Sequence, residues 1–465
     1  MTFSPSIADP DKPQTNPDPS AFNGPYLFDE ATPGVTNTED RDWVGGLNLT
    51  LPFRFGGQGV GSFKFGSKYR DKKKDQNVTE REFGLGDGAA DIVLGSSLGR
   101  SFGNGGYNPG SYPIPFTTSP GEVKNFVSRF GSQLEGEPNL EAETNEYLIR
   151  ERVGAVYAMG ELNFTPKLLL LPGVRFEHTR LSTTGYEYDS ETDLLSPRTG
   201  ENDYGNLFPM VHLRYRFSDR TNLRAAFTTA IFRPNFVDLI PFRVRDDEDL
   251  TLGNPALEPT TSRNYDLLFE HYDQRIGVLS AGVFYKQIVD PIFLFTTDNT
   301  LGGETTQPQN SESGWIRGFE TAFQRQLTFL PAPWDGFGVF ANYTYTDSEA
   351  EQQGGVKTRL PGQAKHVYNL ATSYEKRAFS GQVSLNYTGN SILELGGDRT
   401  EDLYADDRIQ VDVSASYFVT STTQLFVEAL NLGNRPYRTY LARTDRPRQI
   451  EYYEPSLQIG LRFRP

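Results

Sequence analysis

Apolar and polar residues alternate along most of the chain, in about fifteen stretches that run from Trp43 to the C-terminus. In 409–417 one face carries Ile409, Val411, Val413, Ala415 and Tyr417, and the other carries Gln410, Asp412, Ser414 and Ser416. This period of two predicts β-strands. Several stretches exceed ten residues and have a polar face rich in Arg, Asp and Glu, which is typical of a large membrane barrel with lipid outside and a wet interior.

The pattern predicts strands whose connections are alternately short and long. The predicted strands are 43–55, 61–70, 145–164, 168–182, 203–217, 221–232, 263–272, 276–295, 312–328, 336–348, 363–375, 380–395, 407–419, 424–440 and 449–464. The long connections are 71–142, 183–202, 233–262, 296–311, 349–362, 396–406 and 441–448. In membrane barrels short turns lie on the periplasmic side and long loops on the extracellular side.

This alternation fixes the expected direction of each strand. The last strand follows a long loop and should end in the periplasm, and counting back makes the first strand run the same way. We therefore expect residues 1–42, rich in Pro, Asp, Asn and Thr, to be an extracellular or disordered segment before a barrel domain at 43–465. Natural single-chain barrels have even strand numbers. Together with the absence of a secretory signal in residues 1–20, the odd count predicts that upstream strands are missing.

Composition narrows the class of protein. Only 36% of the 465 residues are hydrophobic, and no apolar run is long enough for a membrane-spanning helix. Aromatic residues reach 13%, as expected for barrels with aromatic girdles at both membrane interfaces. The chain has no cysteine, and its net charge of −15 argues against a nucleic acid partner.

Motifs in the second half of the chain resemble the late barrel of TonB-dependent outer-membrane receptors. They are AIFRPNFVDLIPF at 230–242, LTLGNPALEPTTSRNYDLLFEHY at 250–272, GVLSAGVFYKQIVDPIF at 277–293, LPGQAKHVYNLATSYEK at 360–376, NLGNRPYRTY at 431–440 and the final EYYEPSLQIGLRFRP. Single pieces are weak signals, whereas their order and spacing together are specific.

The resemblance implies an all-β antiparallel transmembrane barrel, of which this chain would supply about 15 of 22 strands. It implies a location in the bacterial outer membrane, with lipid and the barrel assembly machinery as partners. The family's plug domain and TonB-contacting segment have no counterpart here, so we expect a TonB complex to engage only through a missing plug. The chain also ends on Arg464-Pro465 after Phe463, although such proteins usually end on an aromatic residue.

Other motifs are weighed against simpler explanations. Residues 95–99 match G-x-S-x-G but lack the strand–turn–helix context that a hydrolase needs. The acidic run 246–249 lacks the ligand spacing of a calcium loop. Two further sets are interpreted as structural or interior polar residues: the histidines His178, His212, His271 and His366, and the charged residues Arg214, Arg216, Asp266, Glu270, Glu320 and Asp412. No catalytic, cofactor or metal residue is predicted, and the substrate-binding residues stay unassigned.

Three functions remain open from the sequence. The first is a non-enzymatic receptor that binds and imports a scarce nutrient such as a metal chelate, cobalamin or an oligosaccharide, with loops 71–142 and 233–262 as its recognition surface. The second is a passive porin without a plug. The third is a soluble all-β protein such as a lectin, which would turn its apolar faces inward. Without a plug, we expect this chain alone not to support energy-dependent uptake.

Overall fold

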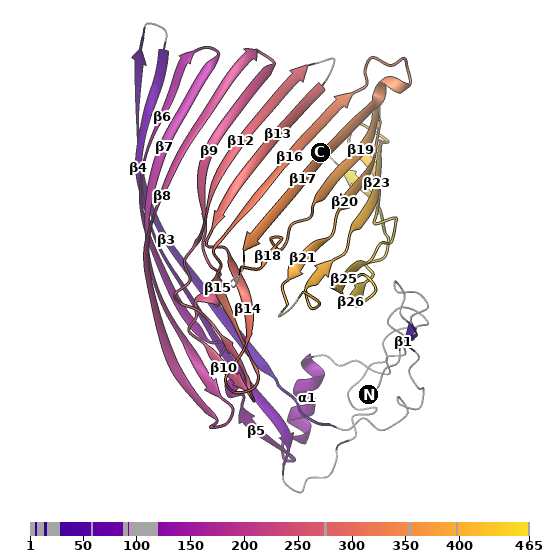
Figure 1. Cartoon of the computed structure of the whole chain (residues 1–465). Coiled ribbons are helices and arrows are strands. Elements are labelled where there is room, and N and C mark those ends of the chain that lie inside the picture. Colours follow the sequence, from indigo (N-terminus) through magenta and orange to yellow (C-terminus); the bar gives the residue numbers. More distant parts are fainter. Residues whose placement is uncertain are drawn as a thin grey trace.

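The computed structural model describes residues 28–56, 59–86, 92, 120–273, 277–351, 355–396 and 399–463, together with the short backbone stretches β1 (Pro5–Ser6) and β2 (Gln14–Thr15). Among these residues, no helix is long and apolar enough to cross a bilayer. The fold is almost wholly β, and most of its strands belong to one curved sheet (Figure 1).

The long strands form a single antiparallel meander. They are β3 (Gly34–Phe55), β4 (Gly59–Leu85), β6 (Tyr147–Thr165), β7 (Leu168–Asp189), β8 (Leu194–Ser218), β9 (Thr221–Phe232), β12 (Thr260–Asp273), β13 (Gly277–Val289), β16 (Ser313–Gln326), β17 (Phe337–Glu351), β19 (His366–Lys376), β20 (Phe379–Thr388), β23 (Arg408–Phe418), β24 (Thr423–Leu430) and β27 (Ser456–Phe463). Each pairs with the next in this order.

Shorter elements gather at the long-loop end, which is the lower end in Figure 1. They are α1 (Pro120–Phe130), β5 (Leu134–Pro138), α2 (Leu140–Glu143), η3 (Val237–Leu239), β10 (Arg243–Asp246), β11 (Asp249–Leu252), β14 (Ile292–Asp298), β15 (Glu304–Asn310), β18 (Lys357–Thr358), β21 (Ser391–Glu394), β22 (Leu403–Ala405), β25 (Tyr437–Leu441) and β26 (Pro447–Glu451). At the opposite end lie tight turns and η4 (Trp334–Gly336).

The sheet is open. Among the described residues, β3 pairs only with β4 and β27 only with β24. Both outermost strands run from the long-loop end to the short-turn end, as the alternation of connections predicts. Fifteen paired long strands also match the predicted strand number.

The predicted strand boundaries are wrong in two situations. One is a charged run that forms a strand, and the other is a backbone bend that divides a predicted strand. The loop predicted at 71–142 is wrong in its first part, because β4 continues to Leu85 and β3 begins earlier, at Gly34. The charged residues there bond across strands: Lys72 Nζ lies 2.8 Å from Asp40 Oδ2, and Arg150 Nη2 lies 2.6 Å from Asp71 Oδ2. Opposite charges on neighbouring strands stabilise pairing, so a charged run can be a strand.

Three predicted long strands are each broken in two. The segment 276–295 breaks at Asp290, whose φ of 54° is left-handed rather than extended. The segment 424–440 breaks between Asn431 and Asn434, which have φ of 55° and 43°. Asp and Asn adopt this left-handed conformation more readily than most residues, which explains their presence at these bends. The segment 380–395 breaks between β20 and β21.

The two faces of the sheet differ in chemistry. We call the face that carries Ile149, Glu151 and Glu177 the inner face, and the opposite one the outer face. Apolar outer residues are strongly exposed: Leu47, Leu457 and Phe463 expose 72%, 67% and 70% of their surface. Val411 and Val413 are half-buried among their sheet neighbours rather than packed in a closed core. An outward apolar face suits lipid as the outer solvent and opposes the soluble reading.

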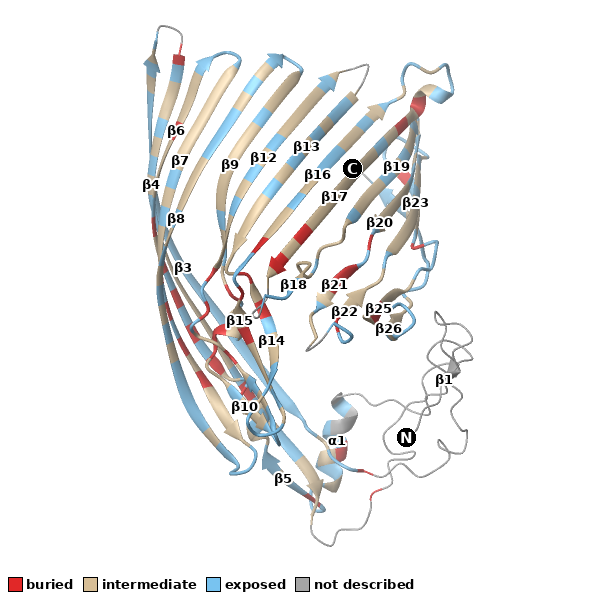
Figure 2. Cartoon of the chain, in the orientation of Figure 1, coloured by how far each residue is buried: buried red, intermediate tan, exposed pale blue. Residues whose placement is uncertain are grey.

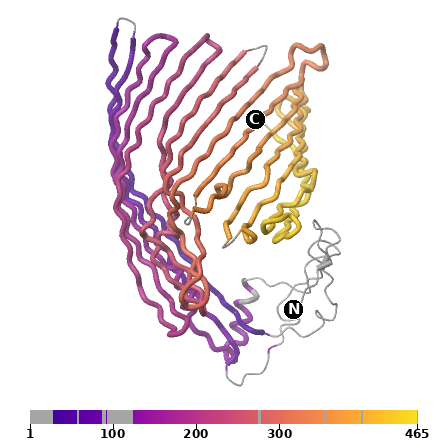
Figure 3. Tube along the Cα trace, in the orientation of Figure 1, coloured from indigo at the N-terminus to yellow at the C-terminus, as the bar shows by residue number. Residues whose placement is uncertain are grey.

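Buried residues concentrate at the long-loop end, where Figure 2 shows them on the lower halves of the first long strands. One cluster joins Tyr147, Ile149 and Leu181 of the inner face to the connection between β9 and β12. A second joins Phe28, Ile92, Phe126 and Leu134 around α1. The tube in Figure 3 shows the same folded-in connection lying beside the early strands.

Candidate functional site

The connection 233–259 is folded onto the inner face and fixed there by apolar packing. Leu239 and Ile240 expose 3% of their surface and Leu257 exposes none, all against Tyr147, Ile149 and Leu181. Fully burying one such side chain contributes roughly 1.5–3 kcal/mol. The connection is therefore held firmly against the inner face of the sheet.

Glycines allow the close approach. A Cβ on Gly253 would lie 1.8 Å from the carbonyl oxygen of Ile240, and one on Gly200 would lie 2.5 Å from Cβ of Pro255. No larger residue fits at either position. The amide of Asn202 then donates to the carbonyl of Leu257 over 2.9 Å, which ties the connection to β8.

Two further contacts hold the connection in place. β10 pairs in parallel with the end of β7, from Arg243 opposite Glu187 to Arg245 opposite Asp189, and so covers a strand edge that β6 leaves free. The β14–β15 hairpin joins the other side, where Gln307 donates to the carbonyl of Gly253 over 3.0 Å. Loop, hairpin and wall thus form one unit.

An ion cluster on the inner face lies next to this unit. Arg233, the first residue after β9, places Nη2 2.6 Å from Glu177 Oε2 and Nε 3.6 Å from Glu151 Oε1. Arg175 lies 2.6 Å from the other oxygen of Glu177, and Arg70 lies 3.9 Å from Glu151. Glu151 exposes only 4% of its side chain, so these partners offset the cost of burying its carboxylate.

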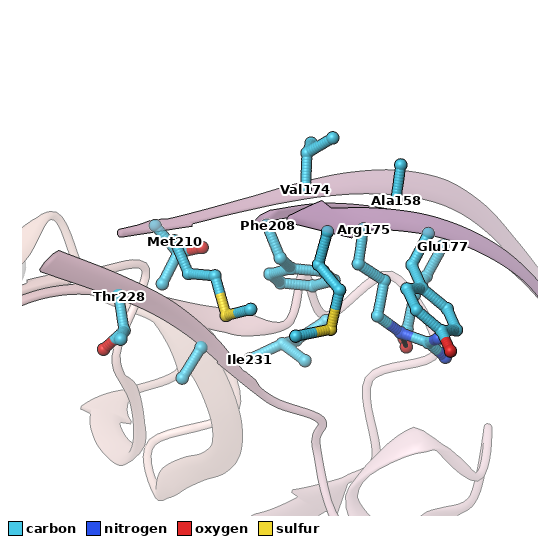
Figure 4. A pocket seen from close by; sticks show the side chains of 12 residues that line it. Ala158, Val174, Arg175, Glu177, Phe208, Met210, Thr228 and Ile231 are labelled. Carbon is cyan, nitrogen blue, oxygen red and sulfur yellow. Dashed lines mark hydrogen bonds and ion pairs between the residues drawn. The ribbon is translucent and has the colours of Figure 1, made fainter. Parts of the chain in front are cut away.

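Beside the ion cluster is a largely apolar cavity of about 470 Å³, which we call the inner hollow. Its lining residues include Tyr157, Met159, Arg175, Glu177, Phe208, Met210, Thr228 and Ala230. In Figure 4, Phe208, Met210, Arg175 and Glu177 point to one side of the wall, while Val174 and Ala158 point to the other. An apolar hollow with a few charged groups at its rim is the usual form of a small-molecule site.

The hollow forms where β8 and β9 separate. Their ladder runs from Ser218 opposite Thr221 to Val211 opposite Phe227 and does not extend to Pro209. Proline has no N–H to donate, so a ladder ends readily beside it. Thr229 instead donates its hydroxyl to the Pro209 carbonyl over 3.0 Å.

The Asp238 carboxyl is partly buried within the connection. Burial raises the pKa of its carboxyl, although the amide of Asn235 donates to it over 3.1 Å and opposes the shift. Burial disfavours the charged form of a carboxyl.

The charged residues predicted for the interior fall into separate places. Arg214, Asp266 and Glu320 line a second inner cavity of about 510 Å³ with His212. Glu270 bonds over 2.5 Å to Arg224, which lines the same cavity. Asp412 is distant from both cavities and accepts from the backbone N–H of Asn431 over 2.8 Å.

The remaining candidate residues from the sequence do not lie together in one site. His178 contacts Asp203, His271 contacts Thr221, and His366 contacts Tyr343. Among the described residues no group of three or more potential metal ligands occurs. The acidic run 246–249 is the exposed tip between β10 and β11, and the G-x-S-x-G match at 95–99 lies outside the described residues.

The ion cluster was not identified from the sequence. Its members are distant in the chain, and Glu151 and Glu177 look like ordinary interior polar residues in alternating strands. Arg233 was visible only as part of the motif with Pro234. No sequence signal places Arg233 opposite Glu177, since that depends on how the connection folds back.

Comparison with family models identifies a match over residues 2–432, described as TonB dependent receptor-like, beta-barrel. Among curated proteins, the chain is 25% identical over 245 residues to the vitamin B12 transporter BtuB of Photobacterium profundum, covering 52% of this chain and 36% of that protein. It is 22% identical over 235 residues to the hemoglobin-binding protein A of Haemophilus influenzae, covering 45% and 23%.

Among solved structures, the siderophore receptor PiuA of Acinetobacter baumannii superposes with a TM-score of 0.59 at 15% identity, over 92% of this chain and 56% of that one. This likeness concerns the fold alone. The chain spans little more than half of that structure, and its matched regions cover still less of the curated relatives.

Proposed function

The chain belongs to the family of TonB-dependent receptor β-barrels, and from this premise we propose that it is the barrel part of a receptor that binds and imports a scarce nutrient. Members of this family are bacterial outer-membrane proteins, and they are transport receptors rather than enzymes. The nutrient classes we propose are a metal chelate, cobalamin or an oligosaccharide. Of these, related proteins are named as a siderophore receptor and a vitamin B12 transporter.

The observation that carries the proposal is the inner hollow beside the fixed connection 233–259. A rigid loop on a rigid wall holds binding groups without a large entropy cost on ligand binding. The hollow offers an apolar surface from Phe208 and Met210 and charged groups from Arg175 and Glu177. We propose that part of the nutrient contacts this wall after entering from the long-loop end.

Binding can be tested on the full chain in detergent with a ferric siderophore, cyanocobalamin, hemoglobin and a malto-oligosaccharide as separate probes. We expect saturable binding of one of them. Met210→Trp should fill the hollow and weaken that binding by about tenfold or more, which corresponds to about 1.4 kcal/mol.

Val211→Trp is the matched control, because Val211 is the next residue on β8 and lies on the outer face, exposing 40% of its surface. It should leave affinity unchanged. Equal effects of both substitutions, or no saturable binding of any probe, would contradict the proposal.

A further inference from the structure

Two hollows lie next to each other on the outer face, across β3, β4, β6, β7 and β8. The first, the arginine hollow, has a volume of about 360 Å³. It is lined by Arg150, Arg152, Arg180, Leu181, Ser182, Glu201, Asn202 and Asp203. The second, the glycine groove, measures about 600 Å³ and is lined by Gly45, Gly46, Leu47, Ser67, Lys68, Tyr69, Gly154, Ala155, Val156, Phe176 and His178.

A row of four charges crosses the arginine hollow. Asp71 of β4 lies opposite Arg152 of β6, Arg152 lies opposite Arg180 of β7, and Arg180 lies opposite Asp203 of β8. The order is therefore negative, positive, positive, negative. Like charges directly opposite each other on neighbouring strands are destabilising, so the central arginine pair is unfavourable by itself.

The carboxylates of Asp71 and Asp203 lie at the two ends of the row, and Glu201 adds a third carboxylate to the lining of the hollow. Asp71 is engaged by Arg150 through two hydrogen bonds of 2.8 and 2.6 Å, and Arg152 approaches it only to 3.7 Å. Arg180 uses Nε on Asp203 over 2.9 Å, and His178 lies 2.8 Å from the other oxygen of that carboxylate.

The central arginines also remain accessible. Arg152 and Arg180 expose 44% and 69% of their side chains. Two neighbouring guanidinium groups suit a phosphate, whose oxygens accept paired N–H bonds. The row thus presents two exposed guanidinium groups side by side between two carboxylates.

The glycine groove begins two residues further along β6. Cβ atoms built on Gly45 or Gly154 would meet nothing within 4 Å, so these glycines leave open space between larger neighbours. Leu47, Val156 and Phe176 are apolar and exposed by 72%, 56% and 43%. Alternate residues on a strand lie about 6.6–6.8 Å apart, so Arg152, Gly154 and Val156 lead directly from the charged hollow into the groove.

We propose that these two hollows form one binding site for a phosphate-bearing membrane lipid. Its phosphate lies between Arg152 and Arg180, and an acyl chain lies in the groove over Gly154. An outer-face site where cations border an apolar belt fits the headgroup and the chain of a lipid together, whereas a free anion would use the first hollow only.

The test measures lipid retention by the full chain. Native mass spectrometry in detergent would count phosphatidylglycerol and phosphatidylcholine bound from equal mixtures. We expect preferential retention of the anionic phosphatidylglycerol, and an R152Q/R180Q double variant should weaken it by about tenfold or more.

Arg317→Gln is the matched control. Arg317 is also on the outer face, exposes 62% of its side chain and lies opposite Asp347 and Tyr285, with no arginine directly opposite it. It should leave retention unchanged. Equal loss in this control, or equal retention of both lipids by the unsubstituted chain, would overturn the proposal.

A second measurement distinguishes a lipid site from a structural ion cluster. In lipid-free detergent, Arg152→Gln should have a higher midpoint of thermal unfolding than the unsubstituted chain, because the repulsion between Arg152 and Arg180 is relieved. With phosphatidylglycerol present, the variant should have the lower midpoint, because it loses a contact to the lipid phosphate. Gly154→Leu should abolish the stabilisation by phosphatidylglycerol and leave any effect of inorganic phosphate intact. Overturning results are an Arg152→Gln shift of the same sign in both conditions, or full stabilisation by inorganic phosphate alone.

Discussion

The early and late parts of the inner wall have the same strand pattern and different burial. On β6, inner residues such as Ile149, Glu151 and Val153 are buried, while their outer neighbours are exposed. On β23, residues of both faces are mostly half-buried. The early wall is covered by connection 233–259, and the two walls show that burial in a single-layer sheet is set by what lies over it.

The polar groups follow the same division. The early wall holds the charged cluster of Arg233, Glu151 and Glu177 in a nearly closed environment. The later wall includes a neutral pair, in which Asn369 donates to Asn342 over 2.8 Å, together with separate charges such as Asp412. A charge needs partners where water is excluded, and amides suffice where water has access.

The largest effect should come from the apolar contact under the connection. Ile149→Ala should destabilise the chain by about 3 kcal/mol, the usual cost of a large-to-small change in a core. Val413→Ala on the outer face of the later strand β23, where no described connection covers the side chain, should cost less than about 1 kcal/mol because Val413 is only half-buried. Urea unfolding in detergent measures both, and similar costs would remove the distinction between the two walls.

The ion cluster should give the second largest effect. Glu177→Gln leaves Arg233 without its closest partner and should cost about 2–3 kcal/mol, somewhat below a fully buried pair. It should also expose connection 233–259 to limited proteolysis. Asp412→Asn on the later wall keeps the side-chain shape and the oxygen that accepts from the backbone N–H of Asn431, and it should change neither property.

A smaller effect concerns the pH dependence of the early region. Because burial raises the pKa of Asp238, its contribution to stability is fully present below the unfolded value of 3.8 and is lost as pH rises through the folded value. Asp238→Asn should therefore protect the connection from proteolysis at neutral pH and have little effect in acid. Greater protease sensitivity of the variant at neutral pH would contradict this.

The smallest effect should come from the short-turn end of the later region. The Lys376 ammonium lowers the pKa of the exposed Asp335 carboxyl through a hydrogen bond. Its contribution is present above the unfolded value of 3.8 and is lost as pH falls through the lower folded value. Asp335→Asn should slightly flatten the acid limb of a stability–pH profile and leave the neutral region unchanged, and the reverse pattern would refute this assignment.

Much of the sheet was predictable because the strands are one layer thick. Each strand that faces lipid on one side and a polar space on the other shows a period of two, as in 409–417. The prediction failed for segments that do not lie between lipid and a polar space. Beyond the apolar belt, residues 71–77 are polar on both faces, and Asp40 and Arg150 pair with Lys72 and Asp71 across the ladder.

The candidate site was less predictable than the sheet. Arg233-Pro234 belongs to the motifs that resemble the receptor family, and loop 233–262 was expected to carry recognition. The sequence contained no sign that Leu239, Ile240 and Leu257 would be buried against Ile149, because these apolar residues have neither strand nor helix spacing. The pairing of Arg152 with Arg180 likewise depends on register.

The sequence by itself determined the class of fold, the strand number, the direction of the first and last strands and the apolar outer face. The reason is that successive side chains of a strand face lipid and a polar space in turn, which leaves an alternating pattern in the sequence. Tertiary structure decided which connection folds inward, which charges meet and where the hollows form. Those features depend on contacts between residues far apart in the chain, and their geometry is set by close approaches such as that of Gly253 to Ile240.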